Sequence, residues 1–108
     1  MGVELTVSIP AGRVIAWADV ATRLAARGTT AQIRMIDSLP AFPDEVPSVD
    51  WSELRISTPG GMITLRRTAA GVTCVAWGTD DPALRRDFRA VAEAVAEAGG
   101  GAVAGDGA

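Results

Sequence analysis

The 108-residue chain contains no histidine, lysine, tyrosine or asparagine, and Cys74 is its single cysteine. Without histidine it has neither the imidazole base that activates serine and cysteine nucleophiles nor the commonest protein metal ligand. Without lysine it has no amine for a Schiff base and no phosphate-binding lysine of a P-loop. The sequence therefore singles out no catalytic residue, no metal ligand and no cofactor site.

Other absences bound the class of protein. A lone cysteine cannot form an internal disulfide, so nothing indicates an oxidising compartment. No apolar run approaches the roughly 18 residues that span a bilayer, and the N-terminal residues lack the layout of a signal peptide. We therefore expect a cytoplasmic protein with no membrane contact. The net charge of -3 also argues against general affinity for nucleic acid.

The composition that remains is rich in alanine and glycine, and every one of its 10 basic residues is an arginine. This usage is typical of a GC-rich bacterial genome. Apolar residues make up 48% of the chain and charged residues 21%, which matches an ordinary globular protein rather than a disordered one.

The pattern of apolar residues predicts secondary structure along most of the chain. Alternation from Val3 to Ile9 predicts a strand, and apolar spacing from Val14 to Ala25, closed by Gly28, predicts a helix. In the next strand Met35 is expected to point inward and Arg34 outward. Strands are expected over 3–9, 30–36, 51–58, 62–67 and 72–77, and a second helix from 82 to 98 after the capping pair Asp81-Pro82.

This β-α-β-β-β-β-α order predicts an α+β fold, with a mainly antiparallel four- to five-stranded sheet and two helices packed on one face. Residues 1–98 are expected to form the single domain, and the Gly-rich residues 99–108 a flexible C-terminal tail. The segment from Asp37 to Asp50, with three prolines, is expected to be a long loop. Its acidic residues match no calcium-loop spacing, so they are interpreted as solvated loop charge.

The most informative feature is the sheet face opposite the helices. Alternation places polar residues there, together with a group of large apolar ones. The apolar group is Trp51, Met62, Val75 and Trp77, and the basic members of the face are Arg34, Arg55 and Arg66. The last expected strand is thus apolar on both faces, and such a strand requires cover on both sides. The cover is either the loop, through Leu39, Phe42 and Val46, or a second copy, or another partner.

Three functions are compatible with this face. The favoured hypothesis is a small non-enzymatic bacterial protein-interaction module, either a homodimer or a partner-docking protein, that uses Trp51, Met62, Val75 and Trp77. The alternative is a small-molecule-binding protein or cofactor-free enzyme of the small α+β barrel type. Its pocket would lie between sheet and helices, with Arg34, Arg55 or Arg66 holding an anionic group. The third is binding of single-stranded nucleic acid, which the acidic charge and the missing RNA-recognition signature disfavour.

Two further groups have ordinary structural interpretations. Cys74 falls on the inward side of its expected strand and no histidine can activate it, so we expect a small buried apolar residue. Arg85, Arg86 and Arg89 cluster on the second helix, but Asp81 and Glu93 lie one turn from Arg85 and Arg89. This spacing is typical of a charge-balanced, solvated helix face.

Overall fold

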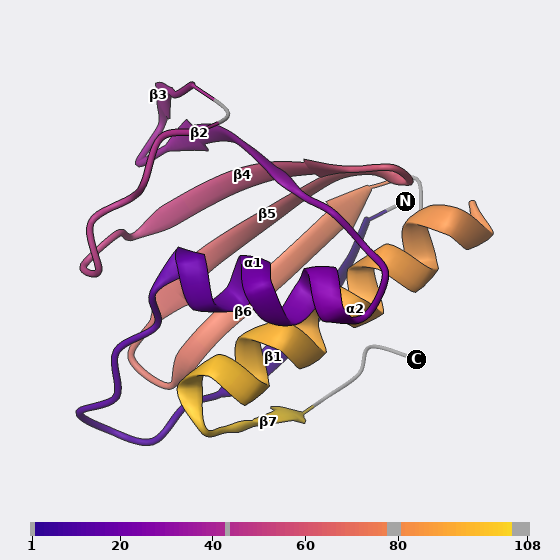
Figure 1. Ribbon diagram of the computed structural model, residues 1–108. Helices are drawn as coiled ribbons and strands as arrows, with labels where there is room; N and C mark the ends of the chain where they lie inside the picture. The colour runs from indigo at the N-terminus through magenta and orange to yellow at the C-terminus, as the bar shows by residue number, and fades with distance from the viewer. Residues whose placement is uncertain (1, 43, 78–80, 105–108) are drawn as a thin grey trace.

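The computed structural model (Figure 1) describes residues 2–42, 44–77 and 81–104. Its elements are, in chain order, β1 (Gly2–Ser8), α1 (Trp17–Ala26), β2 (Gln32–Ile36), β3 (Leu39–Pro40), β4 (Glu53–Thr58), β5 (Gly61–Thr68), β6 (Gly71–Trp77), α2 (Pro82–Gly99) and β7 (Ala102–Ala104). All strands join one antiparallel sheet in the order β3-β2-β4-β5-β6-β1-β7. Both helices lie on the same face of the sheet, and α1 packs on α2.

The predicted α+β class is confirmed, but the predicted sheet of four to five strands is wrong, because the sheet has seven. The two strands that the sequence did not reveal are β3, with two residues, and β7, with three. A strand this short shows no alternation. Positive φ angles at Asp37 and Ser38 turn the chain back to form β3. Gly100, with a φ angle of 69°, turns it back to form β7.

The C-terminal residues 99–104 therefore include the end of α2 and a strand that pairs with β1. This pairing requires glycine at position 101, since a Cβ there would collide with the carbonyl of Ser8. The remainder of the tail that was expected to be flexible, residues 105–108, lies outside the described residues.

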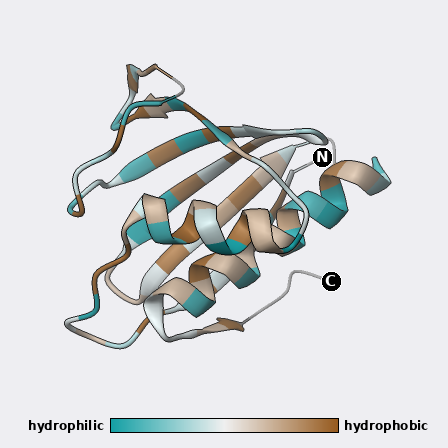
Figure 2. Cartoon of the chain, in the orientation of Figure 1, coloured by the Kyte–Doolittle hydropathy of each residue, from teal (hydrophilic) through white to brown (hydrophobic). Residues whose placement is uncertain are grey.

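The core lies between the helices and one face of the sheet, which we call the inner face. Hydrophobic and hydrophilic residues alternate along β4 and β5 (Figure 2), so each strand sends alternate side chains inward. The stripe predicted for α2 is buried as expected. The largest fully buried side chains are Trp51, Leu24, Ile33, Leu54, Ile56, Ile63, Leu65, Val7, Val20, Val72, Val91 and Val95.

The ends of α2 follow the local signals in its sequence. The Asp81 carboxylate accepts a hydrogen bond from the backbone N–H of Ala83 at 2.9 Å, Pro82 occupies the first turn, and Gly100 ends the helix in the left-handed conformation. Helix α1 begins at Trp17 rather than near Val14, which is 57% exposed. No side chain caps its N-terminus, so the sequence held no signal that would locate its start.

A β-bulge in β2 changes which face its last residues occupy. Ile33 pairs with Ile56, but the register then shifts, and Met35 pairs with Arg55. Because a bulge adds one residue to one strand, alternation reverses beyond it. Met35 therefore lies on the same face as Arg55, opposite to the inward side predicted for it.

Candidate docking site on the outer sheet face

The face of the sheet opposite the helices, here called the outer face, is arranged in two central rows by the strand register. The first row runs across β1, β6, β5, β4 and β2 through Glu4, Val75, Thr64, Arg55 and Met35. The second runs across β1, β6, β5 and β4 through Thr6, Thr73, Arg66 and Glu53. Since both described helices lie on the inner face, neither covers these rows.

Trp77 and Met62 form the apolar end of the outer face. Trp77 is 71% exposed and Met62 is 50% exposed, whereas Val75 is half-buried among its neighbours. A Cβ at Gly2 would lie 2.7 Å from the Cε3 and Cζ3 atoms of the Trp77 ring. The ring therefore lies across the backbone of β1 at its strand partner Gly2, and its other side faces solvent.

Trp51, the fourth residue predicted for this surface, lies in the core instead. It is 1% exposed, and its indole Nε1 donates to the carbonyl of Ile15 at 3.0 Å. β4 begins only at Glu53, so the alternation of the strand does not extend back to Trp51. The Arg67 guanidinium lies over its ring, 4.7 Å from the centroid.

The Pro-rich loop does not cover the outer face through the residues expected to do so. Leu39, Phe42 and Val46 are 68%, 74% and 75% exposed. In Figure 1 the segment with β3 projects from the β2 edge of the sheet. The prediction that these three side chains cover the outer face is therefore wrong. They leave the exposed surface of Trp77 and Met62 open.

The three arginines predicted as anion contacts are all exposed members of the outer face rather than of a pocket beneath the helices. Arg34 Nε donates to Ser57 Oγ at 3.0 Å. Arg66 Nε lies 3.0 Å from Glu53 Oε2, and Arg55 Nε lies 4.0 Å from the other oxygen of the same carboxylate. Glu53 thus engages Arg66 closely and Arg55 only weakly. The pocket expected between sheet and helices does not contain them.

Hollows elsewhere on the described surface include the following two. One, of about 140 Å³, lies where β1 ends and is lined by residues 9–13, Ile15, residues 67–69 and Gly71. There Arg67 Nη2 donates to the carbonyls of Val49 and Ile15 at 2.6 and 3.3 Å. The other is an open depression beside the end of α1, lined by Arg27, Gly28, Thr29, Arg86, Arg89, Ala90 and Glu93. Neither hollow includes a residue of the outer face.

Asp87 is a buried acidic residue that the sequence pattern did not single out. It is 1% exposed, and its Oδ2 accepts a hydrogen bond from the backbone N–H of Gly60 at 2.7 Å. Leu84, Asp87, Phe88 and Val91 are spaced i, i+3, i+4 and i+7, so Asp87 occupies the apolar stripe of α2. A charged residue at such a position was the available signal. The Asp87 carboxylate connects the β4–β5 turn to α2 through this hydrogen bond.

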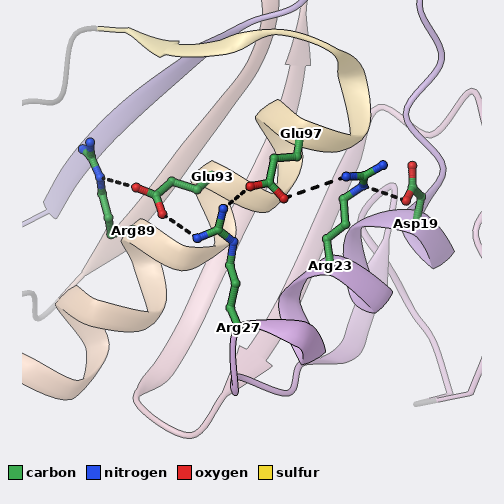
Figure 3. Close-up of polar contacts among 6 residues, drawn as sticks. All are labelled: Asp19, Arg23, Arg27, Arg89, Glu93 and Glu97. Atoms are coloured by element: carbon green, nitrogen blue, oxygen red, sulfur yellow. Dashed lines mark hydrogen bonds and ion pairs between the residues drawn. The ribbon is translucent and has the colours of Figure 1, made fainter.

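Charge pairs cross the surface where α1 and α2 meet (Figure 3). Arg27 contacts both Glu93 and Glu97, and Arg23 lies 3.9 Å from Glu97. The predicted pair of Arg89 with Glu93 is present at 3.2 Å, and within α1 Asp19 lies 2.9 Å from Arg23. These charged side chains pair with one another across the surface of the two helices, so their clustering is explained by the packing of α1 on α2.

Two perturbed groups have simple physical causes. The backbone N–H groups of Glu53 and Ser52, with the Ser52 hydroxyl, hydrogen-bond to Asp37 and lower its pKa. Burial raises the pKa of the Cys74 thiol to about 12, as expected for a fully buried thiol with an unreactive sulfur. No group of three or more potential metal-binding side chains occurs within residues 2–42, 44–77 and 81–104.

Comparison with known proteins gives no relative: no family model, no curated protein and no solved structure matches the chain. Among the helices that the structure describes, none has the length and apolar character needed to cross a membrane. The outer face is therefore the part of the described surface that bears on function.

Proposed function

We propose that this chain is a non-enzymatic protein-interaction module that docks another polypeptide chain on the outer face of its sheet. The observation that carries the proposal is Trp77, which is 71% exposed beside the half-exposed Met62 on a face that neither helix covers. Exposed aromatic and methionine side chains grouped on one surface are characteristic of the centre of protein interfaces.

Covering this surface is energetically favourable. A tryptophan buries roughly 150–250 Å² when it is covered, so burying its exposed part contributes about 3–4 kcal/mol of hydrophobic free energy before the entropic cost of association is subtracted. Met62 adds a smaller amount. The surrounding threonines and the charged residues Glu4, Arg55 and Arg66 supply the polar rim that surrounds the apolar centre of a typical interface.

Single-stranded nucleic acid would use the same face, with Trp77 as the stacking platform and the arginines as phosphate contacts. The pairing of Arg66 with Glu53 counts against it, because an arginine that already holds a carboxylate attracts a phosphate less. With a net charge of -3, the chain also repels a polyanion over longer distances. Protein docking is therefore the function that the face supports best.

A site-specific crosslinking experiment tests the proposal. A photo-crosslinking amino acid is placed at Thr64, in the middle of the outer face, and as a control at Ala18, on the exposed side of α1. We expect a discrete protein adduct from Thr64 in cells, no adduct from Ala18, and loss of the Thr64 adduct in Trp77→Ser. A matched variant, Val14→Ser, removes an exposed apolar side chain away from the sheet and should keep the adduct.

The result that contradicts the proposal is equally definite. If Thr64 gives no discrete adduct while the protein is folded and abundant, the outer face does not dock a protein. If Trp77→Ser unfolds the chain, as judged by its far-ultraviolet circular dichroism, then Trp77 supports the core and the argument from its exposure fails. The mass of the adduct identifies whether the bound chain is another copy or a different protein.

A further inference from the structure

We infer that the chain bound to the outer face is a second copy of the same protein, packed face to face about a two-fold axis that runs along the strands between β5 and β6. This inference rests on the proposed function, and it adds the identity and orientation of the partner. It comes from the register of the strands, which determines which side chains such an axis would bring together.

A two-fold axis of this kind pairs equivalent positions of two identical sheets. When the axis lies between the sheets and parallel to the strands, a residue on one side of it faces the residue that lies equally far on the other side in the partner. With the axis between β5 and β6, residues of β5 therefore face those of β6, and residues of β4 face those of β1. Rows stay matched, because the rotation does not shift positions along the strands.

The charged pairs of the first row are complementary under this axis. Arg55 on β4 would face the partner's Glu4 on β1, and the symmetry would form this pair twice. Both side chains are exposed, and the 4.0 Å contact from Arg55 to Glu53 leaves its charge only weakly engaged. Long side chains of this kind can bridge sheets that pack about 10 Å apart.

The apolar residues are complementary under the same axis. Ile63 pairs with Ala76, so the preceding residue on β5, Met62, and the following residue on β6, Trp77, flank the axis at the same level. Met62 would therefore face the partner's Trp77, and the exposed surfaces of both would be buried in two equivalent contacts. In the second row Arg66 would face the partner's Thr73, so no like charges meet.

Neighbouring positions of the axis are less favourable. An axis on β5 places Arg66 opposite its own copy, which brings like charges together. An axis on β6 places Glu4 opposite Thr64 and leaves Arg55 without an acidic partner. An axis between β4 and β5 places Met62 opposite Ser57. The axis between β4 and β5 would also pair Glu53 with the partner's Arg66, but it places Trp77 opposite Gln32. Only the axis between β5 and β6, among these four, joins opposite charges and also covers Trp77 with an apolar side chain.

The size of the face fits a dimer that dissociates on dilution. Strands about 20 Å long at a spacing of about 4.8 Å give the five strands from β2 to β1 a footprint of roughly 400–500 Å² on each copy. The two copies together would bury on the order of 1,000 Å², the lower bound for specific interfaces. We therefore expect a measurable equilibrium between monomer and dimer rather than a permanent assembly.

Charge reversal with rescue tests the inference. Glu4→Arg, Arg55→Glu and the double variant are compared with the unmodified chain by sedimentation equilibrium over a range of concentrations. We expect a reversible dimer, a Kd at least tenfold higher in each single variant, and recovery to within about threefold in the double variant. Asp44→Arg, the same type of charge change at an exposed loop residue, should leave the Kd unchanged.

Each other outcome is informative. A dimer that neither single variant weakens, or one that the double variant fails to restore, overturns the proposed axis. A chain that stays monomeric but gives a Thr64 adduct with a different protein overturns the second copy as partner and leaves the proposed function intact. A monomer without any Thr64 adduct overturns both. Circular dichroism of each variant verifies that these surface changes leave the fold unaltered.

Discussion

The contact between the β4–β5 turn and α2 gives a sharp prediction about stability. At Gly60 an added Cβ would lie 2.6 Å from both the N and the Cα of Leu84, a backbone that cannot move aside. The Gly60 N–H also donates to the buried Asp87 carboxylate at 2.7 Å. Gly60→Ala and Asp87→Ala therefore disturb the same contact, one by collision and the other by removal of the hydrogen-bond acceptor.

The magnitudes follow from these two mechanisms. Asp87→Ala loses a hydrogen bond to a buried charge, which costs about 1.5–3 kcal/mol of unfolding free energy. The lower half of that range is expected, because Asp87 Oδ1 accepts no hydrogen bond among the described residues and its 3.6 Å ion pair with the exposed Arg86 adds little. Gly60→Ala forces the turn away from the helix and costs about 1–3 kcal/mol, as other overpacked sites do.

A double-mutant cycle separates this mechanism from two independent effects. Once Gly60→Ala has moved the turn, the hydrogen bond to Asp87 is already lost, so the double variant should be more stable than the sum predicts by about 1–2 kcal/mol. Urea denaturation, followed by tryptophan fluorescence, measures each free energy. Asp87→Asn keeps an oxygen acceptor and should lose less than Asp87→Ala. Strict additivity, or a Gly60→Ala effect below about 0.5 kcal/mol, would refute the proposed contact.

Three other predictions concern single residues. Arg67→Met removes the hydrogen bonds to the carbonyls of Val49 and Ile15 and the contact with the Trp51 ring. Urea denaturation should therefore show a loss of about 1–2 kcal/mol of unfolding free energy. An unchanged midpoint would mean that other contacts hold the segment around Val49 in place. Asp37→Asn should destabilise the protein at neutral pH but not in acid. The lowered pKa of Asp37 in the folded state stabilises the fold above the unfolded value of 3.8, and this gain is lost as the pH falls through the folded pKa. Equal destabilisation at pH 7 and pH 2.5 in thermal melts would contradict this prediction. Cys74, fully buried with its pKa raised to about 12, should react with a thiol reagent at pH 8 only as fast as the protein opens, and rapid labelling of the native protein would disprove its burial.

The parts of the fold that the sequence predicted well are those with strong local signals. Asp81-Pro82 and the glycines after residue 98 mark the ends of α2, and the intervening apolar stripe identifies its buried face. The hairpins formed by β4, β5 and β6 could equally be predicted from the sequence, since long alternating strands are joined by Pro59-Gly60-Gly61 and by the turn before Gly71. In each case neighbours in the sequence determine the structure.

The residues that were placed wrongly depend on contacts distant in the sequence. Trp51 lies two residues before β4, so its burial is determined by Ile15 and Arg67 rather than by strand alternation. Met35 changes face because of a bulge that only the pairing with β4 reveals. β3 and β7 exist because turns at Ser38 and Gly100 bring very short segments alongside other strands. Sequence periodicity carries none of this information.

For the candidate site, the sequence placed Met62, Val75 and Trp77 on one face, but it could not describe how Trp77 lies. The ring lies over the backbone of its strand partner Gly2, where any larger residue would meet the ring at the position of its Cβ. Glycine at this position therefore leaves room for the indole against β1. A ring held against the strand adds less height above the sheet than one that projects from it, which suits a second sheet packed about 10 Å away. Gly2 therefore prepares Trp77 for a thin interface between two sheets, and this is the strongest link between the local sequence and the proposed pairing of two copies.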